Sequence, residues 1–170
     1  MYLAIGGLEW KVGEGKMAER SLEDRLDEIE SRTAVAALVA HYCEAVDHRN
    51  LELFMGLWHA DGTLNILGGR GVFHGTEELR NSQAGVAKAW SRTWHWTTNL
   101  TVDFDGPDRA TGRSDVFAIC EGYGDGHICL VGGTYHDVAE RREGVWRFTE
   151  RVIARYFVSS PQDIPLPPPS

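Results

Sequence analysis

The sequence predicts a single α+β domain in which helices precede an antiparallel sheet, and three observations support this fold class. The chain has 170 residues, which is about the length of one domain. Helical patterns occupy its first half, and four long strand patterns separated by strong turn signals fill most of the second half. Hydrophobic residues make up 42% and charged residues 25%, as is ordinary for a globular protein.

The first helical pattern is long and begins at Ser21, a suitable N-cap with Glu23 and Asp24 in the first turn. Leucine and isoleucine recur at helical spacing from there. We expect a break near Ser31, which divides a polar first segment from a core helix over residues 32–48.

Two shorter helices follow. Asn50 is expected to cap a helix that carries Leu53, Phe54, Leu57 and Trp58. Thr76 is expected to cap a third helix over residues 77–90.

Strand patterns make up most of the remaining chain. Between the second and third helices, residues 63–67 and 71–74 fit a strand and a short return strand. After the third helix, turn signals rich in glycine, aspartate and proline separate four long segments. The segments cover residues 93–104, 110–121, 128–141 and 145–157. Helices first and then a meander of strands indicate an α+β domain with an antiparallel sheet.

The two ends of the chain differ in composition from the rest. Residues 1–20 form a glycine-rich N-terminal extension, partly irregular, within which Met17 is a second candidate start. Residues 158–170 form a tail with five prolines, for which an extended conformation is expected. The domain proper is expected to span residues 21–157.

Composition excludes several classes of function. The formal net charge of −8 argues against a nucleic-acid partner, because phosphate binding needs a basic surface. No apolar run is long enough to span a membrane, and no secretory signal is apparent, so we expect a cytoplasmic protein without a membrane partner. Cys43, Cys120 and Cys129 are an odd set at irregular spacing, which favours free thiols in a reducing compartment. No histidine pair has metal-ligand spacing, so no metal is expected.

Asp47 is the first candidate for chemistry. It falls at the C-terminal end of the long helix, where the helix dipole disfavours a carboxylate. Either it is a solvated loop residue or it has a functional partner.

His95 lies between two tryptophans in a strand pattern. Strict alternation puts Trp94 and Trp96 on one face with Leu100, Val102 and Phe104, and His95 on the other with Thr97, Asn99 and Thr101. The second face is either exposed to solvent or the polar lining of a closed cavity. In a cavity, a histidine could transfer protons near neutral pH.

Arg151 and Asp115 are charged residues within apolar strand patterns. Arg151 must reach solvent or pair with an anion inside, because an unpaired buried charge is costly. Asp115 alternates with Phe117 and Ile119, so it shares their face and points inward if that face is buried. Either residue could also be an ordinary surface residue.

Four segments in order resemble the SnoaL-like family of the nuclear-transport-factor-2-like superfamily. They are Ala45–Arg49, His95–Leu100, Gly132–Tyr135 and Glu140–Phe148, and the resemblance runs from about Ser31 to Phe157. It implies a cone-shaped fold, in which a curved mixed or antiparallel sheet is wrapped by three N-terminal helices around one pocket. It also suggests a homo-oligomer, either a trimer or a dimer.

Within this family the chain is most similar to γ-hexachlorocyclohexane dehydrochlorinase and its relatives. That resemblance implies an aspartate–histidine dyad at Asp47 and His95, and an anion-stabilising arginine at Arg151. One position departs from it, because Tyr42 stands where a lysine is expected. A tyrosine there is similar to the bile-acid 7α-dehydratase pattern, with Asp115 as a fifth member. Scytalone dehydratase shares the same architecture.

These residues together predict a lyase that needs no cofactor, with dehydration of a hydrophobic, oxygenated alicyclic or polycyclic molecule as its reaction. His95 is expected to be the base, Asp47 its orienting partner, and Tyr42 with Arg151 the electrophilic groups. Further candidates for substrate contact are Asp115 and the aromatic residues Trp58, Trp90, Trp94, Phe117 and Tyr135. Isomerase or cyclase chemistry, dehydrochlorination, and a non-catalytic binding or assembly role remain alternatives.

Overall fold

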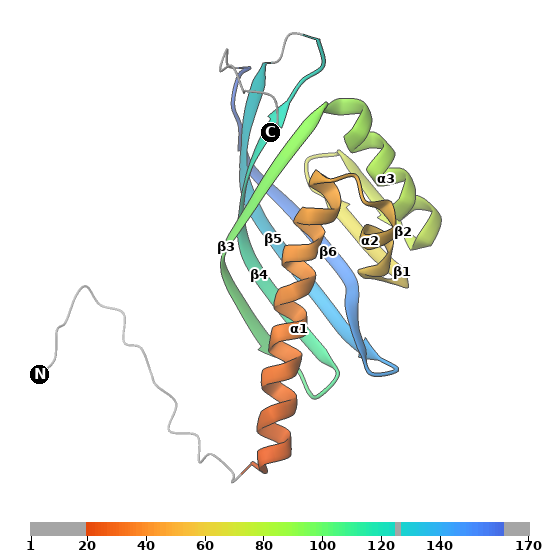
Figure 1. Ribbon diagram of the computed structural model, residues 1–170, viewed down its shortest axis with the longest axis vertical. Coiled ribbons are helices and arrows are strands. Elements are labelled where there is room, and N and C mark those ends of the chain that lie inside the picture. Colours follow the sequence, from red (N-terminus) through yellow and green to blue (C-terminus); the bar gives the residue numbers. More distant parts are fainter. Residues whose placement is uncertain (1–19, 125–126, 162–170) are drawn as a thin grey trace, which may run out of the picture.

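The computed structural model describes residues 20–161 with the exception of 125–126, and it shows three helices and a six-stranded sheet (Figure 1). Residues 1–19 of the expected N-terminal extension, including Met17, and most of the proline-rich tail lie outside the described residues. The helices are α1 (Leu22–Asp47), α2 (Leu51–Gly56) and α3 (Gly75–Ala89). The strands are β1 (Trp58–Ile66), β2 (Gly71–His74), β3 (Arg92–Phe104), β4 (Arg109–Glu121), β5 (Ile128–Arg142) and β6 (Val145–Val158).

Helix α1 is continuous, so the expected break near Ser31 is wrong. It starts with a capping box, in which Ser21 Oγ accepts from the Asp24 N–H at 3.0 Å and Asp24 accepts from the Ser21 N–H at 3.2 Å. Ser31 is buried, because Arg141 of β5 reaches across to α1. The Arg141 guanidinium pairs with Asp27 at 2.5 Å and lies 3.4 Å from Ser31 Oγ. This contact holds the middle of the helix against the sheet.

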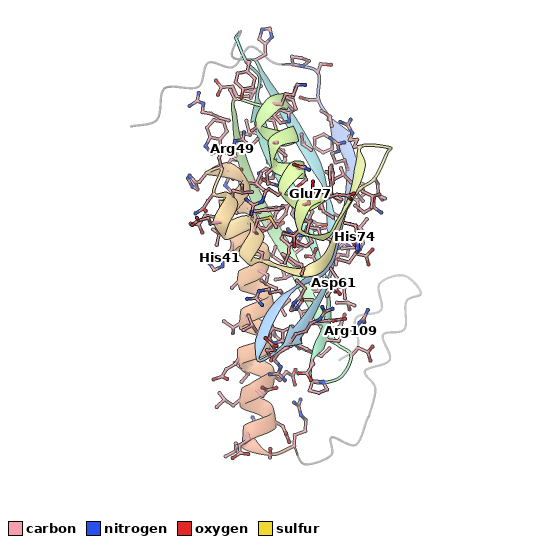
Figure 2. The ribbon with its side chains drawn as sticks, turned by 90° about the vertical axis from the view of Figure 1, so that its right-hand side faces the viewer. His41, Arg49, Asp61, His74, Glu77 and Arg109 are labelled. Carbon is pink, nitrogen blue, oxygen red and sulfur yellow. The ribbon has the colours of Figure 1, made fainter. Side chains whose placement is uncertain are left out.

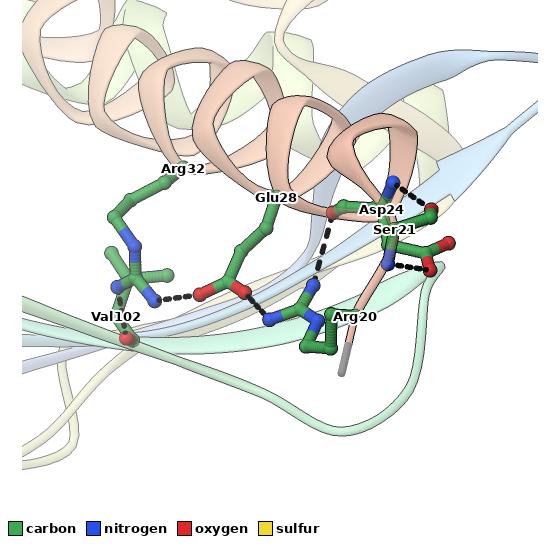
Figure 3. Close-up of polar contacts among 6 residues, drawn as sticks. All are labelled: Arg20, Ser21, Asp24, Glu28, Arg32 and Val102. Atoms are coloured by element: carbon green, nitrogen blue, oxygen red, sulfur yellow. Dashed lines mark hydrogen bonds and ion pairs between the residues drawn. The ribbon is translucent and has the colours of Figure 1, made fainter. Parts of the chain in front are cut away.

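Ion pairs extend along the same side of α1 toward its N-terminus (Figure 3). Glu28 pairs with both Arg20 and Arg32, and Arg32 donates to the Val102 carbonyl of β3 at 2.6 Å. The first turns of the helix extend beyond the sheet (Figure 1), which leaves Leu22 and Ile29 exposed despite their helical spacing.

The two shorter helices have different starts. Asn50 caps α2 as expected, because its side chain accepts from the Leu53 N–H at 3.0 Å. Helix α3 starts at Gly75, two residues earlier than a Thr76 cap requires, and the His74 N–H is instead satisfied by the Glu78 carboxylate at 2.7 Å. No helix in the described part of the chain is both long enough and apolar enough to cross a membrane.

The sheet confirms the predicted α+β class and adds one feature that local patterns did not predict. The strand order is β2-β1-β6-β5-β4-β3. All neighbours are antiparallel except β1 and β6, which pair in parallel with Leu64 opposite Arg151. The sheet curves around the helices, with α1 packed against its inner face and α3 near β1 and β2 (Figure 1). The core lies between them and includes the fully buried Phe54, Leu64 and Phe148.

A bulge in β3 reverses the faces expected from strict alternation. Asn99 has φ of +55°, and the register with β4 shifts between Thr98 and Thr101. One extra residue in a strand sends the side chains after it to the opposite face. Val102 therefore faces the core, whereas Trp96 on the other side of the bulge is 50% exposed. The prediction that Trp94 and Trp96 share a face with Leu100, Val102 and Phe104 is wrong for this reason.

Candidate active site

A cavity of about 180 Å³ lies between the inner face of the sheet and helices α1 and α3. Its wall is mostly apolar, with Val46 from α1, Leu64 from β1, Val86 from α3, Val116 from β4 and Ile153 from β6. Such a cavity is typical of small-molecule sites, in which a few polar groups orient a ligand within an apolar wall. Figure 2 views the molecule from the side of α3 and the β1–β2 region, with its side chains drawn.

Asp47 and His95 meet at the wall of this cavity. The Asp47 carboxylate accepts two hydrogen bonds from the same histidine, from its backbone N–H at 2.7 Å and at its ring Nδ1 at 2.6 Å. Both side chains are largely buried, with 15% of the His95 side chain and 14% of the Asp47 side chain exposed. His95 lines the cavity, and Asp47 contacts the cavity only through it.

This geometry sets the chemistry available to the imidazole. A carboxylate accepts at Nδ1, so Nδ1 carries the proton and Nε2 keeps a free lone pair. The carboxylate also stabilises the imidazolium that forms when Nε2 accepts a proton. The two donors explain how Asp47 is tolerated at the negative end of α1, because both of its carboxylate oxygens have hydrogen-bond partners there.

Tyr42 lines the same cavity from α1, five residues before Asp47. Burial raises the pKa of Tyr42 to about 12, although the nearby charge of Arg151 acts in the opposite direction. Its hydroxyl has no hydrogen bond to any of the described residues. The phenol therefore stays protonated near neutral pH and is available as a donor to a ligand.

Arg151 is fully buried and paired with Asp137 of β5. Its Nε and Nη2 donate to the two carboxylate oxygens of Asp137, each at 2.7 Å. The remaining Nη1 has no partner in the described part of the chain. Burial alone would lower the pKa of Arg151, but the charge and hydrogen bonds of Asp137 outweigh this effect and raise the pKa above its usual value.

Three aromatic rings surround the Arg151 guanidinium. Its Cζ lies 4.1 Å from the ring centre of Tyr42, 4.3 Å from that of Tyr135 and 4.4 Å from that of Phe148. Arg151 is not part of the cavity wall, so it acts on the cavity through the tyrosines that separate the two. Of the two possibilities open for Arg151, exit to solvent or an internal anion, the structure has the internal anion.

The other predicted contact residues divide into three groups. Trp90 and Tyr135 line the cavity as expected. Trp58 is buried in the core against Phe54 and Phe148 instead, with ring centres 5.8 Å and 5.3 Å apart. The third group lies outside the cavity on the opposite face of the sheet.

That third group consists of Trp94, Phe117 and Asp115. Phe117 pairs with Trp96 across β3 and β4, with ring centres 6.1 Å apart, and is 39% exposed. Asp115 does share the face of Phe117, but this is the outer face, where Asn99 and Arg113 bind its carboxylate at 2.8 Å and 3.0 Å. The inward face of β4 carries Ser114, Val116, Ala118 and Cys120.

Three further residues of the site were missed in the sequence, although alternation could have identified them. Asp137 is two residues after Tyr135 on β5, Arg155 is two after Ile153 on β6, and Thr93 is two before His95 on β3. Arg155 and Thr93 line the cavity. Each follows from a period of two once one neighbour is known to face inward.

The cysteines do not provide a reactive thiol at the cavity. All three are free and buried, as expected. Burial raises the pKa of Cys43 to about 11 and that of Cys120, which lines the cavity, to about 12. Thiols with such pKa values carry almost no thiolate at neutral pH. Among the described residues, no group of three histidine, cysteine, aspartate or glutamate side chains is placed to hold a metal ion.

Comparison with known proteins identifies the family. The model of the SnoaL-like domain matches residues 27–152, which is most of the chain. The chain belongs to the SnoaL-like domain family. The matched region contains Asp47, His95 and Arg151, together with α2, α3, most of α1 and most of the sheet.

Proteins similar to this chain include dehydrochlorinases. γ-Hexachlorocyclohexane dehydrochlorinase of Sphingobium indicum is 29% identical over 134 residues, which cover 78% of this chain and 85% of the relative. The crystal structure of LinA, a hexachlorocyclohexane dehydrochlorinase, superposes with a TM-score of 0.80 at 27% identity, covering 86% of this chain and 99% of LinA. A scytalone dehydratase-like protein of Novosphingobium aromaticivorans has the same fold, with a TM-score of 0.73 at 19% identity over 79% of this chain and 90% of its own.

Proposed function

We propose that this SnoaL-like protein is a lyase, and specifically a dehydratase that eliminates water from a hydrophobic, oxygenated alicyclic or polycyclic molecule. The observation that carries the proposal is the pair of hydrogen bonds from His95 to Asp47 at the wall of an apolar cavity. The relation to dehydrochlorinases supports the general class, because dehydrochlorination is also an elimination.

Elimination requires a base for a C–H proton, and His95 fits that role. Its Nε2 accepts the proton, and the Asp47 carboxylate stabilises the resulting imidazolium. The electrons of the C–H bond form the new double bond as the C–O bond breaks. After the product leaves, His95 releases its proton to solvent and Tyr42, which has given its proton to the departing water, takes one back from solvent, so both groups return to their starting states.

Departure of water also requires a proton donor for the leaving oxygen, and Tyr42 fits that role. Hydroxide is a poor leaving group, so the departing oxygen needs a hydrogen bond or a proton in the transition state. The phenol of Tyr42 is protonated across the neutral range, since its pKa is about 12. The buried cation of Arg151 lies behind its ring and favours negative charge that develops on the phenol oxygen.

Dehydrochlorination is the second candidate, and the 29% identical relative favours it. Chloride leaves without a proton, so a dehydrochlorinase has less need of a phenol at position 42. The two reactions are separated by their products. Incubation with γ-hexachlorocyclohexane tests for chloride release, and incubation with a panel of hydroxylated alicyclic and polycyclic compounds tests for loss of the mass of one water.

The decisive experiment compares His95→Ala with Glu44→Gln in the panel assay. Glu44 is an exposed residue of the same helix as Asp47 and serves as the matched control. We expect water loss in the wild type and in the control, and a fall in rate of about 10²–10⁴-fold in His95→Ala. Full activity of His95→Ala would contradict the proposal, and a product of unchanged mass would indicate an isomerase instead.

A further inference from the structure

The charge of the cavity wall is opposite to that of the protein as a whole. The chain has a net charge of −8, yet the described residues that line the cavity include no aspartate or glutamate and two arginines, Arg70 and Arg155. The two acids close to the site do not neutralise them, because Asp47 is held by His95 and Asp137 by Arg151. The cavity therefore presents positive charge within an apolar wall.

Arg155 is the arginine that reaches into the protein. Its Nη2 is buried and has no hydrogen-bond partner in the described part of the chain, and no ion pair within that part involves its guanidinium. Arg151, four residues earlier on the same strand, shows the usual solution, in which a carboxylate binds two guanidinium nitrogens at 2.7 Å. A buried N–H of a charged group is costly when it has no hydrogen-bond partner. Arg155 therefore requires an acceptor, and the described residues do not supply one.

Arg155 faces the cavity by alternation with Ile153, and a bulge follows it on β6. The register of β5 and β6 shifts so that Gly132 lies opposite Phe157 and Gly133 opposite Arg155, which leaves Tyr156 as an extra residue. A Cβ on Gly133 would lie 2.3 Å from the Ala154 carbonyl oxygen, so the close approach of the two backbones depends on glycine. After the extra residue the alternation resumes in the opposite phase, and Arg155 and Val158 both line the cavity.

A second polar atom of the cavity wall also lacks a partner. The Thr93 hydroxyl is buried, lines the cavity, and makes no hydrogen bond to any described residue. Thr93 lies two residues before His95, on the same face of β3. The unpartnered groups are thus a cationic donor on β6 and a neutral hydroxyl beside the candidate base, which is the complement of a ligand with a negative end and an oxygen function.

We propose that Arg155 binds the carboxylate of the substrate, with Arg70 at the edge of the cavity attracting the same charge. This inference rests on the proposed function, because it assigns the substrate to the class of hydrophobic monocarboxylic acids that carry a hydroxyl group to be lost. The carboxylate lies at Arg155, the ring contacts the apolar wall, and the C–H and C–O bonds to be broken lie between His95 and Tyr42.

A monocarboxylate fits better than a neutral ligand or a phosphate. A neutral molecule would leave the buried guanidinium nitrogen unpaired, whereas the two oxygens of a carboxylate match the planar fork of arginine. A phosphate dianion would bring two charges into an apolar wall where one arginine is in the interior and the other, Arg70, is exposed.

The test measures binding without turnover. Cyclohexanecarboxylate and its neutral amide, cyclohexanecarboxamide, are titrated by calorimetry into the full-length protein, into Arg155→Gln and into the control Arg80→Gln, an exposed arginine of α3 outside the cavity wall. We expect the wild type and Arg80→Gln to bind the acid about tenfold or more tightly than the amide, and Arg155→Gln to lose this preference. Arg155→Lys, which keeps the charge but not the fork, should retain part of it.

Several results would overturn the inference. They are equal affinity of the wild type for acid and amide, no measurable binding of the acid, or an unchanged preference in Arg155→Gln that melts like the wild type. The binding test gives its result whether or not the proposed reaction is correct, because it involves no turnover. His95→Ala should keep the preference for the acid, so a failure of catalysis and a failure of carboxylate recognition give different results.

Discussion

Asp47 holds His95 at two points, the backbone N–H and the ring Nδ1, at 2.7 Å and 2.6 Å. The two contacts join the end of α1 to the first half of β3, so a single carboxylate sets the position of the strand and the tautomer of the ring. This explains why an aspartate occupies a helix end that disfavours it, and it leads to the first prediction.

Replacing Asp47 by asparagine should lower turnover and release the His95 ring from a single tautomer. The amide can accept from only one of the two donors through its oxygen, so Nδ1 no longer has to carry the proton. We expect turnover to fall by about 10²–10⁴-fold. Nitrogen NMR of the imidazole should show the Nδ1–H tautomer in the wild type and in Glu44→Gln, and a mixture of tautomers in Asp47→Asn. The same tautomer in all three proteins would contradict this account of the pair.

Breaking the Arg151–Asp137 pair should reduce stability strongly. Arg151→Met leaves a carboxylate buried without its partner, and such changes cost about 3–5 kcal/mol. The double variant Arg151→Met/Asp137→Leu should recover a large part of that loss, because neither charge remains. Urea unfolding measures the free energy of unfolding of the single and the double variant. The matched surface change is Arg109→Gln, whose pair with Asp105 at 3.6 Å is exposed and should contribute at most about 1 kcal/mol.

Ionisation of the buried Tyr42 should lower the free energy of unfolding at alkaline pH. Its pKa is about 12 in the folded protein and about 10 in an unfolded chain. The folded state therefore holds the phenol proton more tightly, and stability that is fully present below pH 10 is lost as the pH rises toward 12. The shift corresponds to about 3 kcal/mol. Urea unfolding between pH 8 and 11 should show a smaller decline in Tyr42→Phe than in the wild type, and an equal decline would contradict the prediction.

The same substitution should affect catalysis more than folding. The Tyr42 hydroxyl makes no hydrogen bond to the described residues, so its removal leaves no protein group unpaired. At pH 7 we expect Tyr42→Phe to unfold at nearly the same urea concentration as the wild type. Dehydration should slow by about 10²-fold or more, because the departing oxygen loses its donor. Rapid dehydration by a stable Tyr42→Phe protein would remove Tyr42 from the mechanism.

The bulge at Asn99 should tolerate glycine but not valine. Its φ of +55° suits asparagine and glycine, whereas a β-branched residue in that conformation is strained by about 1–2 kcal/mol. Urea unfolding should rank Asn99→Val below Asn99→Gly. Two proteins of equal stability would show that the strand can lose its bulge.

The helices and the strand meander follow from local sequence signals, and the site follows only in part. Caps and periodicity located α1 and α2, because those signals lie within a few residues of each other. The break expected at Ser31 is absent because Arg141, far along the chain, binds that part of the helix. Thr76 failed as a cap because the Glu78 side chain satisfies the start of α3 first.

Faces of strands were harder to predict, because one extra residue reverses them. The bulge at Asn99 placed Trp94 outside and His95 inside, whereas for β4 alternation was right but did not reveal which face was inner. Arg151 could be predicted to need an anion, but Asp137 as that anion depends on the register of β5 and β6. Distant pairing of this kind leaves no mark in the local pattern.

The parallel pairing of β1 with β6 has a consequence for how the chain acquires its structure. Until the last strand is in place, β1 and β2 have no neighbour to join them to β5, β4 and β3, and the sheet exists as two separate pieces. Pairing β6 with β1 closes a long loop of the chain, and loop closure costs conformational entropy. We therefore expect this step to limit the rate of folding. The sheet of a nascent chain on the ribosome therefore stays in two pieces until β6 emerges, and a chain truncated before β6 loses Arg151, Arg155 and the cavity together.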